Sequence, residues 1–144
     1  EHYVLADGCE RTKGFSLPGW FAGSLSDLLS NEASKVWIEA AAPSVLLTLP
    51  WADVRRWQET LPAWTRFGWR VAERLYMMKV EREYELLAMD AAARLDATLA
   101  RWPTLDQVFS QRDIASYVGV TPVHLSRLRT AKAASPAPGS PPSR

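Results

Sequence analysis

The spacing of apolar residues along this chain changes near residue 50. Before that point, short apolar or β-branched runs alternate with turn dipeptides such as Asp7-Gly8 and Pro18-Gly19. Ser24–Ser30 fits one helical turn under a Ser24 or Ser26 cap. The spacing predicts short strands in a small sandwich or barrel, and these strands are Tyr3–Leu5, Phe15–Leu17, Val36–Ala40 and Val45–Leu49.

After residue 50 the spacing becomes helical. Thr48 and Pro50 suit the start of a short helix that runs to about Glu59, and Pro62 then opens a much longer helix ending near Met89. A helix of about 25 residues spans roughly 37 Å, which is longer than a domain of this size covers. We therefore expect a dimerisation helix, the alternative being an ordinary core helix that packs on the strand layer. Its predicted buried stripe consists of Trp64, Val71, Leu75, Met78, Leu86 and Met89.

Two further helices and a tight turn are predicted towards the C-terminus. Ala91–Arg101 forms a helix that Pro103 stops, and a second helix starts at Gln111. Gly119 stands where a tight turn needs a positive φ. The inner face of the helix before this turn consists of Ile114, Ala115 and Val118.

The helix after this turn has a polar outer face. Thr121 caps it and Pro122 takes its first position, while Leu125 and Leu128 point inward. This pattern is typical of a helix-turn-helix, whose second helix enters the major groove of DNA. The alternative is a helical hairpin that binds protein and leaves its arginines solvated. The predicted DNA-binding residues are Thr121, Pro122, His124, Ser126, Arg127 and Arg129.

The charge distribution also favours the C-terminal end of the chain as the part that binds DNA. Residues 101–132 hold five basic and two acidic side chains, a net charge of +3, whereas residues 1–100 hold eleven basic and fourteen acidic ones, a net charge of −3. Positive charge gathered at one end suits a polyanion such as DNA.

Several classes of protein are disfavoured. The single cysteine, Cys9, and the distant pair His2 and His124 provide no disulfide and no zinc or iron–sulfur ligand set, so we expect no metal and no cofactor. No Ser/His/Asp set or phosphate-binding glycine loop indicates an enzyme. No apolar stretch of about 20 residues or signal-peptide layout is present, so we expect a cytoplasmic protein that does not enter a membrane.

The motifs quoted above resemble those of the Crp/Fnr family of transcription regulators. Asp113–Arg129 is similar to the family's DNA-binding signature, and Trp64–Met89 matches its dimerisation helix in position. Phe15–Gly23 is similar to the β-roll segment that leads into the effector pocket, and Arg94-Leu95 with Pro103 to the linker that follows the long helix. The resemblance implies an α+β fold, in which a jelly-roll-like β-roll precedes the long helix and a helix-turn-helix domain.

The sequence departs from the family at three places. Members that bind cyclic nucleotides have a glutamate after the pocket glycine and an adjacent Arg-Ser pair, whereas here Ser24 follows Gly23 and the pair is Ser34-Lys35. A cyclic phosphate needs a positive or backbone partner, so we expect no cyclic nucleotide to bind. Pro122 and Val123 replace the Arg-Glu pair that contacts bases. The β-roll is also partial, because the family's roll begins several strands earlier.

Together these patterns predict four segments and one function. Residues 1–60 are a partial β-roll with effector-pocket candidates Gly23, Ser24, Ser34 and Lys35, and residues 61–89 are the dimerisation helix. Residues 90–132 form the helix-turn-helix domain, and residues 133–144 a disordered tail. The predicted function is a homodimeric, sequence-specific transcription regulator with DNA and RNA polymerase as partners and an unidentified effector. The alternative is an interaction module that dimerises without sensing a ligand.

Overall fold

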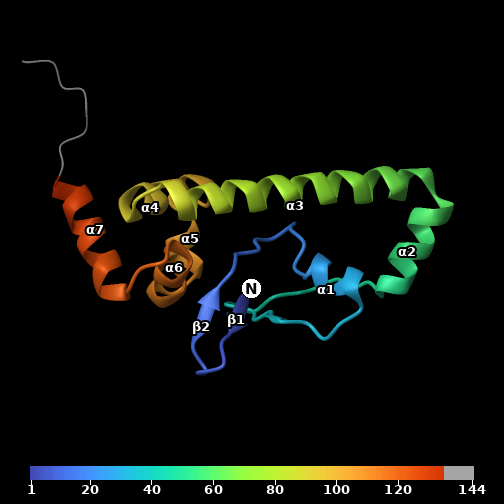
Figure 1. The fold of residues 1–144 in the computed structure, drawn as a ribbon, viewed down its shortest axis with the longest axis horizontal. Coiled ribbons are helices and arrows are strands. Elements are labelled where there is room, and N and C mark those ends of the chain that lie inside the picture. Colours follow the sequence, from blue (N-terminus) through green and yellow to red (C-terminus); the bar gives the residue numbers. More distant parts are fainter. Residues whose placement is uncertain (135–144) are drawn as a thin grey trace, which may run out of the picture.

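The structure is a computed structural model that describes residues 1–134, and it is mostly helical, at 59%. The long helix α3 runs along one side of the molecule, with α2 at one end and α4 to α7 at the other (Figure 1). A small sheet and α1 lie along α3 between these ends (Figure 1). The helices are α1 (Leu25–Ser30), α2 (Trp51–Thr60), α3 (Pro62–Ala88), α4 (Ala91–Arg101), α5 (Leu105–Val108), α6 (Gln111–Val118) and α7 (Pro122–Ala134).

The prediction of a partial β-roll is wrong. The described residues contain one antiparallel sheet in the order β2-β1-β3, made of β1 (His2–Val4), β2 (Glu10–Thr12) and β3 (Val36–Trp37). The predicted Asp7-Gly8 turn does connect β1 to β2, with Gly8 at φ +76°. The sheet is far too small to enclose an effector, and the fold is therefore helical with a small sheet attached.

Two of the predicted strands do not form, because no other strand of the described residues pairs with them. A strand is stable only when a second strand completes its backbone hydrogen bonds. Val45–Leu49 forms no strand, and Val45 and Leu47 are 102% and 91% exposed. Phe15–Leu17 is not a strand either, because Phe15 instead packs into the helical C-terminal core.

Helices α2 and α3 form a hairpin held by aromatic side chains. Helix α2 starts at Trp51 with Pro50 in the cap position, so the predicted Thr48 cap is wrong. Pro62 opens α3 as predicted, and Met89 ends it in an extended conformation. The rings of Trp57 and Trp64 lie 4.8 Å apart across the hairpin. At about 40 Å, α3 is longer than any other element described.

The main core lies within the C-terminal helices. Leu95, Leu105, Ile114, Val118 and Leu125 are at most 1% exposed and come from four different helices. Apolar burial of this kind supplies most of the stability of a small domain. Phe15, far away in sequence, completes this core through ring contacts of 4.5–5.5 Å with Phe109, Tyr117 and Trp102.

The predicted tail at residues 133–144 lies outside the described residues, except for its first two, which extend α7. None of the helices within residues 1–134 combines the length and apolarity needed to cross a membrane.

Candidate nucleic-acid interface

The turn between α6 and α7 has the geometry predicted for it. Gly119 adopts φ +83°, a left-handed conformation that a side chain disfavours. Its backbone N–H donates to the carbonyl of Ser116 at 3.2 Å, and the N–H of Val120 donates to that of Ala115 at 2.9 Å. These two bonds form a Schellman motif, which stops α6 and redirects the chain within three residues.

Thr121 then starts α7 as a side-chain cap. Its hydroxyl accepts a hydrogen bond from the backbone N–H of His124 at 3.2 Å, and Pro122 takes the first helical position. Leu125 is fully buried between the two helices, and Leu128 packs against the same core. The predicted inward face of α7 is therefore confirmed, and the predicted outward face is confirmed apart from Arg129, which is half-buried.

Most of the predicted DNA-binding residues gather on the exposed face of α7. Arg127 is exposed there, with Val123 63% exposed one turn before it. A guanidinium suits a guanine edge or a phosphate, and an apolar side chain suits a thymine methyl group. The predicted residues that are exposed are Thr121, Pro122, His124, Ser126 and Arg127.

The cations of α7 differ in whether they are already paired. Arg129 is half-buried and pairs with Asp106 of α5 at 2.5 Å, and Lys132 pairs with Asp96 of α4 at 2.5 Å. Arg127 makes no ion pair with any residue in the part of the chain that the structure describes. Of the three, Arg127 alone is left available to a phosphate or a base without first giving up an acidic partner.

A buried polar cluster connects α6 to the long helix. Glu85 of α3 is 2% exposed and is bound by Arg82, at 3.1 Å, and by Arg101 of α4. The Arg101 guanidinium also donates to the hydroxyl of Tyr117 on α6 at 3.1 Å. Burial raises the pKa of the Tyr117 hydroxyl, so this group stays protonated and accepts the bond through its oxygen.

The effector-pocket candidates do not form a phosphate site. Ser34 donates its hydroxyl to the carboxylate of Asp27 at 2.8 Å, and the backbone N–H of Lys35 donates to the same oxygen at 3.2 Å. Hydrogen bonds from Ser24 and Ser34 lower the pKa of Asp27, which keeps its charge negative. Gly23 lies in open space nearby. The hydrogen-bond donors that would bind the phosphate of an effector therefore already bind the carboxylate of Asp27.

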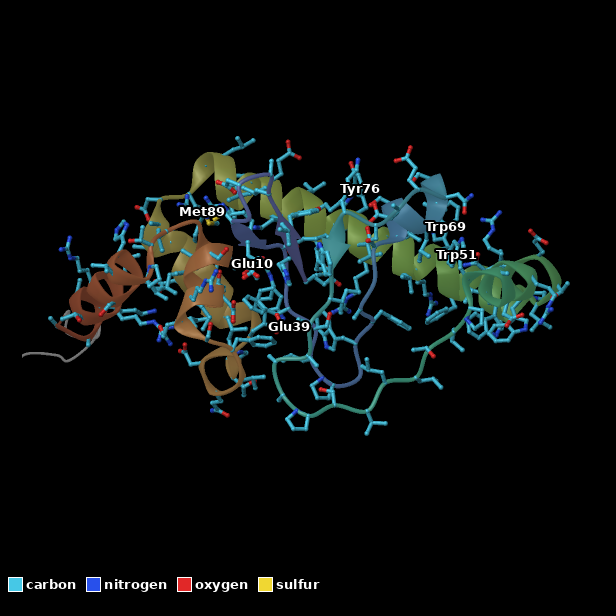
Figure 2. All side chains as sticks on the ribbon, turned by 90° about the horizontal axis from the view of Figure 1, so that it is seen from below. Glu10, Glu39, Trp51, Trp69, Tyr76 and Met89 are labelled. Carbon is cyan, nitrogen blue, oxygen red and sulfur yellow. The ribbon has the colours of Figure 1, made fainter. Side chains whose placement is uncertain are left out.

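The predicted stripe of α3 is only one of two apolar stripes. The predicted stripe, here called the inner stripe, includes Trp64, which packs on α2, and Met78 and Met89, which are half-buried. Its Leu75 and Leu86 are 37% and 51% exposed, so the prediction that they are buried is wrong. A second stripe, the outer stripe, lies on the other side of the helix and was missed because single aromatic residues among charged ones resemble a solvated face. The outer stripe consists of Trp69, Tyr76, Val80, Tyr84 and Leu87 (Figure 2 labels Trp69 and Tyr76).

Neither a known protein family, nor a curated protein, nor a solved structure matches this chain.

Proposed function

We propose that this protein is a sequence-specific DNA-binding transcription regulator that acts as a homodimer, with α7 as the helix that enters the major groove. The observation that carries the proposal is the α6–α7 pair, in which a Schellman turn and the Thr121 cap present an outer face with one unpaired arginine. Rigid presentation of a long bidentate donor is what base recognition requires. The Crp/Fnr resemblance of Asp113–Arg129 supports the same function.

The homodimer is supported by the outer stripe. Trp69, Tyr76 and Leu87 are 71%, 67% and 79% exposed. Steps of three, four and seven residues along a helix form the seam of a coiled coil, and a second copy carries the same seam. Each stripe has three aromatic side chains, and at about 200 Å² for each of them two stripes bury up to roughly 1,200 Å² together. That area reaches the size of a specific interface, and a monomer rarely leaves such a patch uncovered.

The proposal is tested by selecting bound sequences from random duplex DNA with the purified protein. A palindrome with half-sites about 34 Å apart, or a multiple of that spacing, is expected, because two α7 helices related by a two-fold axis must enter successive major grooves. Affinity should fall steeply with salt, since phosphate contacts release counterions. Failure to enrich any sequence, with weak binding at low salt, would favour the interaction module instead.

Substitution of Arg127 makes the test specific to α7. Arg127→Ala should weaken binding to the selected site by about 1–3 kcal/mol and relax the preference at one base pair. Arg112→Ala is the matched control, because Arg112 is exposed on α6 and pairs with Glu10 at 3.3 Å. Competition titrations at two salt concentrations measure both variants. If Arg127→Ala leaves affinity and sequence preference unchanged, α7 does not recognise DNA.

A further inference from the structure

A carboxylate occupies the most protected position of the long helix. Glu85 is 2% exposed and is the one buried residue of α3, while apolar residues of the same helix remain in solvent. Burial of an unpaired carboxylate is strongly unfavourable, so such a position is occupied only where partners surround the charge. The location of Glu85 therefore depends on what the neighbouring helices bring to it.

The partners come from α3, α4 and α6. Arg82, one turn before Glu85 on α3, binds Glu85 and donates to the main-chain carbonyl of Tyr117 on α6. The Arg82 guanidinium also lies 4.0 Å from the centre of the Tyr117 ring. Arg101 of α4 binds Glu85 from the other side and reaches the Tyr117 hydroxyl. The four side chains, here called the buried cluster, join three helices through directional bonds.

The buried cluster spans a break in the backbone. Met89 is extended, at φ −98° and ψ 145°, so α3 and α4 are separate rods. Arg94 of α4 bonds the carbonyls of Met89 and Val118 at 2.6 and 2.8 Å and reinforces the joint. Replacing a buried ion cluster by apolar residues often leaves the stability of a protein unchanged. The directional bonds of such a cluster instead fix one relative orientation of the helices that carry it.

We infer that the buried cluster of Arg82, Glu85, Arg101 and Tyr117 fixes the direction of α7 relative to α3, and that Glu85 is a positioning residue for DNA binding. The inference rests on the proposed function: if α3 joins two copies, the orientation across the Met89 joint sets the distance between the two α7 helices. Half-site spacing, rather than the affinity of a single α7, is then the property that Glu85 controls.

The orientation is measured first without DNA. Spin labels are placed at Lys79→Cys on α3 and Thr130→Cys on α7 in a Cys9→Ser background, and labelled chains are diluted with unlabelled protein. Pulsed electron resonance should give one narrow distance in the parent and a broad or second distance in Glu85→Gln. Glu81→Gln is the matched control, because its 55% exposed carboxylate lies 3.7 Å from the same Arg101 and should leave the distance unchanged.

DNA binding provides the second measurement. Glu85→Gln should bind the selected palindrome about 2- to 30-fold more weakly. It should bind a single half-site as the parent does and tolerate half-sites moved by one base pair. A narrow, unshifted distance in Glu85→Gln would overturn the inference even if DNA binding is weakened. A broadened distance in Glu85→Gln, together with a parent protein that binds no DNA, would instead overturn the proposed function and leave only the orientation of α7 by the buried cluster.

If Glu85→Gln does not fold, the same distance is measured in the variant Tyr117→Phe. This substitution keeps the ring beneath Arg82 and removes only the hydroxyl that Arg101 reaches. A broadened distance with unchanged helical circular dichroism supports the inference, and an unchanged distance overturns it.

Discussion

Residues 91–134 and residues 36–87 use apolar side chains in opposite ways. In the first region, leucine, isoleucine and valine from four helices close around a core, as Leu95 and Ile114 do at 1% and 0% exposure. In the second, leucines such as Leu47 and Leu87 face solvent at 91% and 79% exposure. The two regions therefore gain stability from different sources.

The difference indicates which part of the protein depends on association. Four helices that pack against each other on all sides can bury their apolar faces within one chain. The long helix contacts α2, Trp20 and Phe21, and the C-terminal helices, but the residues of its outer stripe remain 41–79% exposed. We therefore expect perturbations to act on folding in the first region and on dimerisation in the second.

The largest effect, a loss of dimerisation, is expected when charged side chains are introduced into the outer stripe. Val80→Glu combined with Leu87→Glu buries carboxylates at the proposed interface and should weaken the dimer by at least about 5 kcal/mol, or more than about three orders of magnitude. Lys79→Glu is the matched control, because residue 79 lies about 100° round the helix from residue 80. Light scattering after size exclusion measures the mass of each. A parent protein that is monomeric at micromolar concentration would contradict the dimer.

The same substitution in the two regions should have unequal effects on folding. Leu125→Ala removes a fully buried side chain from between α6 and α7 and should lower the free energy of unfolding by about 2–5 kcal/mol. Leu47→Ala removes an exposed one and should change it by less than about 0.5 kcal/mol. Urea unfolding followed by circular dichroism compares them. Equal losses would show that residues 45–49 are buried in solution.

Glycine substitutions sharpen the comparison at the level of the backbone. Gly119→Ala forces a side chain into φ +83° and should cost about 1–2 kcal/mol, although space for the Cβ is available. Gly23→Ala, with an ordinary φ and nothing within 4 Å, should be nearly neutral. Gly119→Asn should recover part of the loss because asparagine tolerates this conformation. Thermal unfolding ranks the three, and a neutral Gly119→Ala would mean that the turn relaxes.

The smallest effect is expected when cyclic nucleotides are added, because the predicted effector-pocket residues in the N-terminal segment, outside both regions, form no phosphate site. Cyclic AMP and cyclic GMP should give no measurable heat, because Ser34 and the Lys35 backbone already donate to Asp27. The loss of one buried charged partner costs on the order of 2–5 kcal/mol, a large part of a micromolar affinity. Isothermal titration calorimetry measures this directly. A micromolar dissociation constant would show that the phosphate site lies elsewhere.

Most of the helices and their ends could be predicted from the sequence alone, although α5 was missed and the predicted Thr48 cap of α2 is wrong. Pro62, Pro103, Gly119 and Thr121 all act on backbone groups within four residues of themselves, so their effects do not depend on the rest of the chain. The exposed face of α7 followed from the same local periodicity. Every site residue predicted on α7 except the paired Arg129 is exposed there.

Only the tertiary structure decided what those elements pack against. A strand needs a partner from a distant part of the chain, so the apolar run Val45–Leu49 predicted a strand that the fold does not form. Phe15 joins a core that lies some ninety residues further along, and Glu85 is bound by Arg101, 16 residues away on another helix. The sequence therefore determined where most of the helices begin and end, whereas burial, ion pairing and the two faces of α3 depended on contacts that no local pattern specifies.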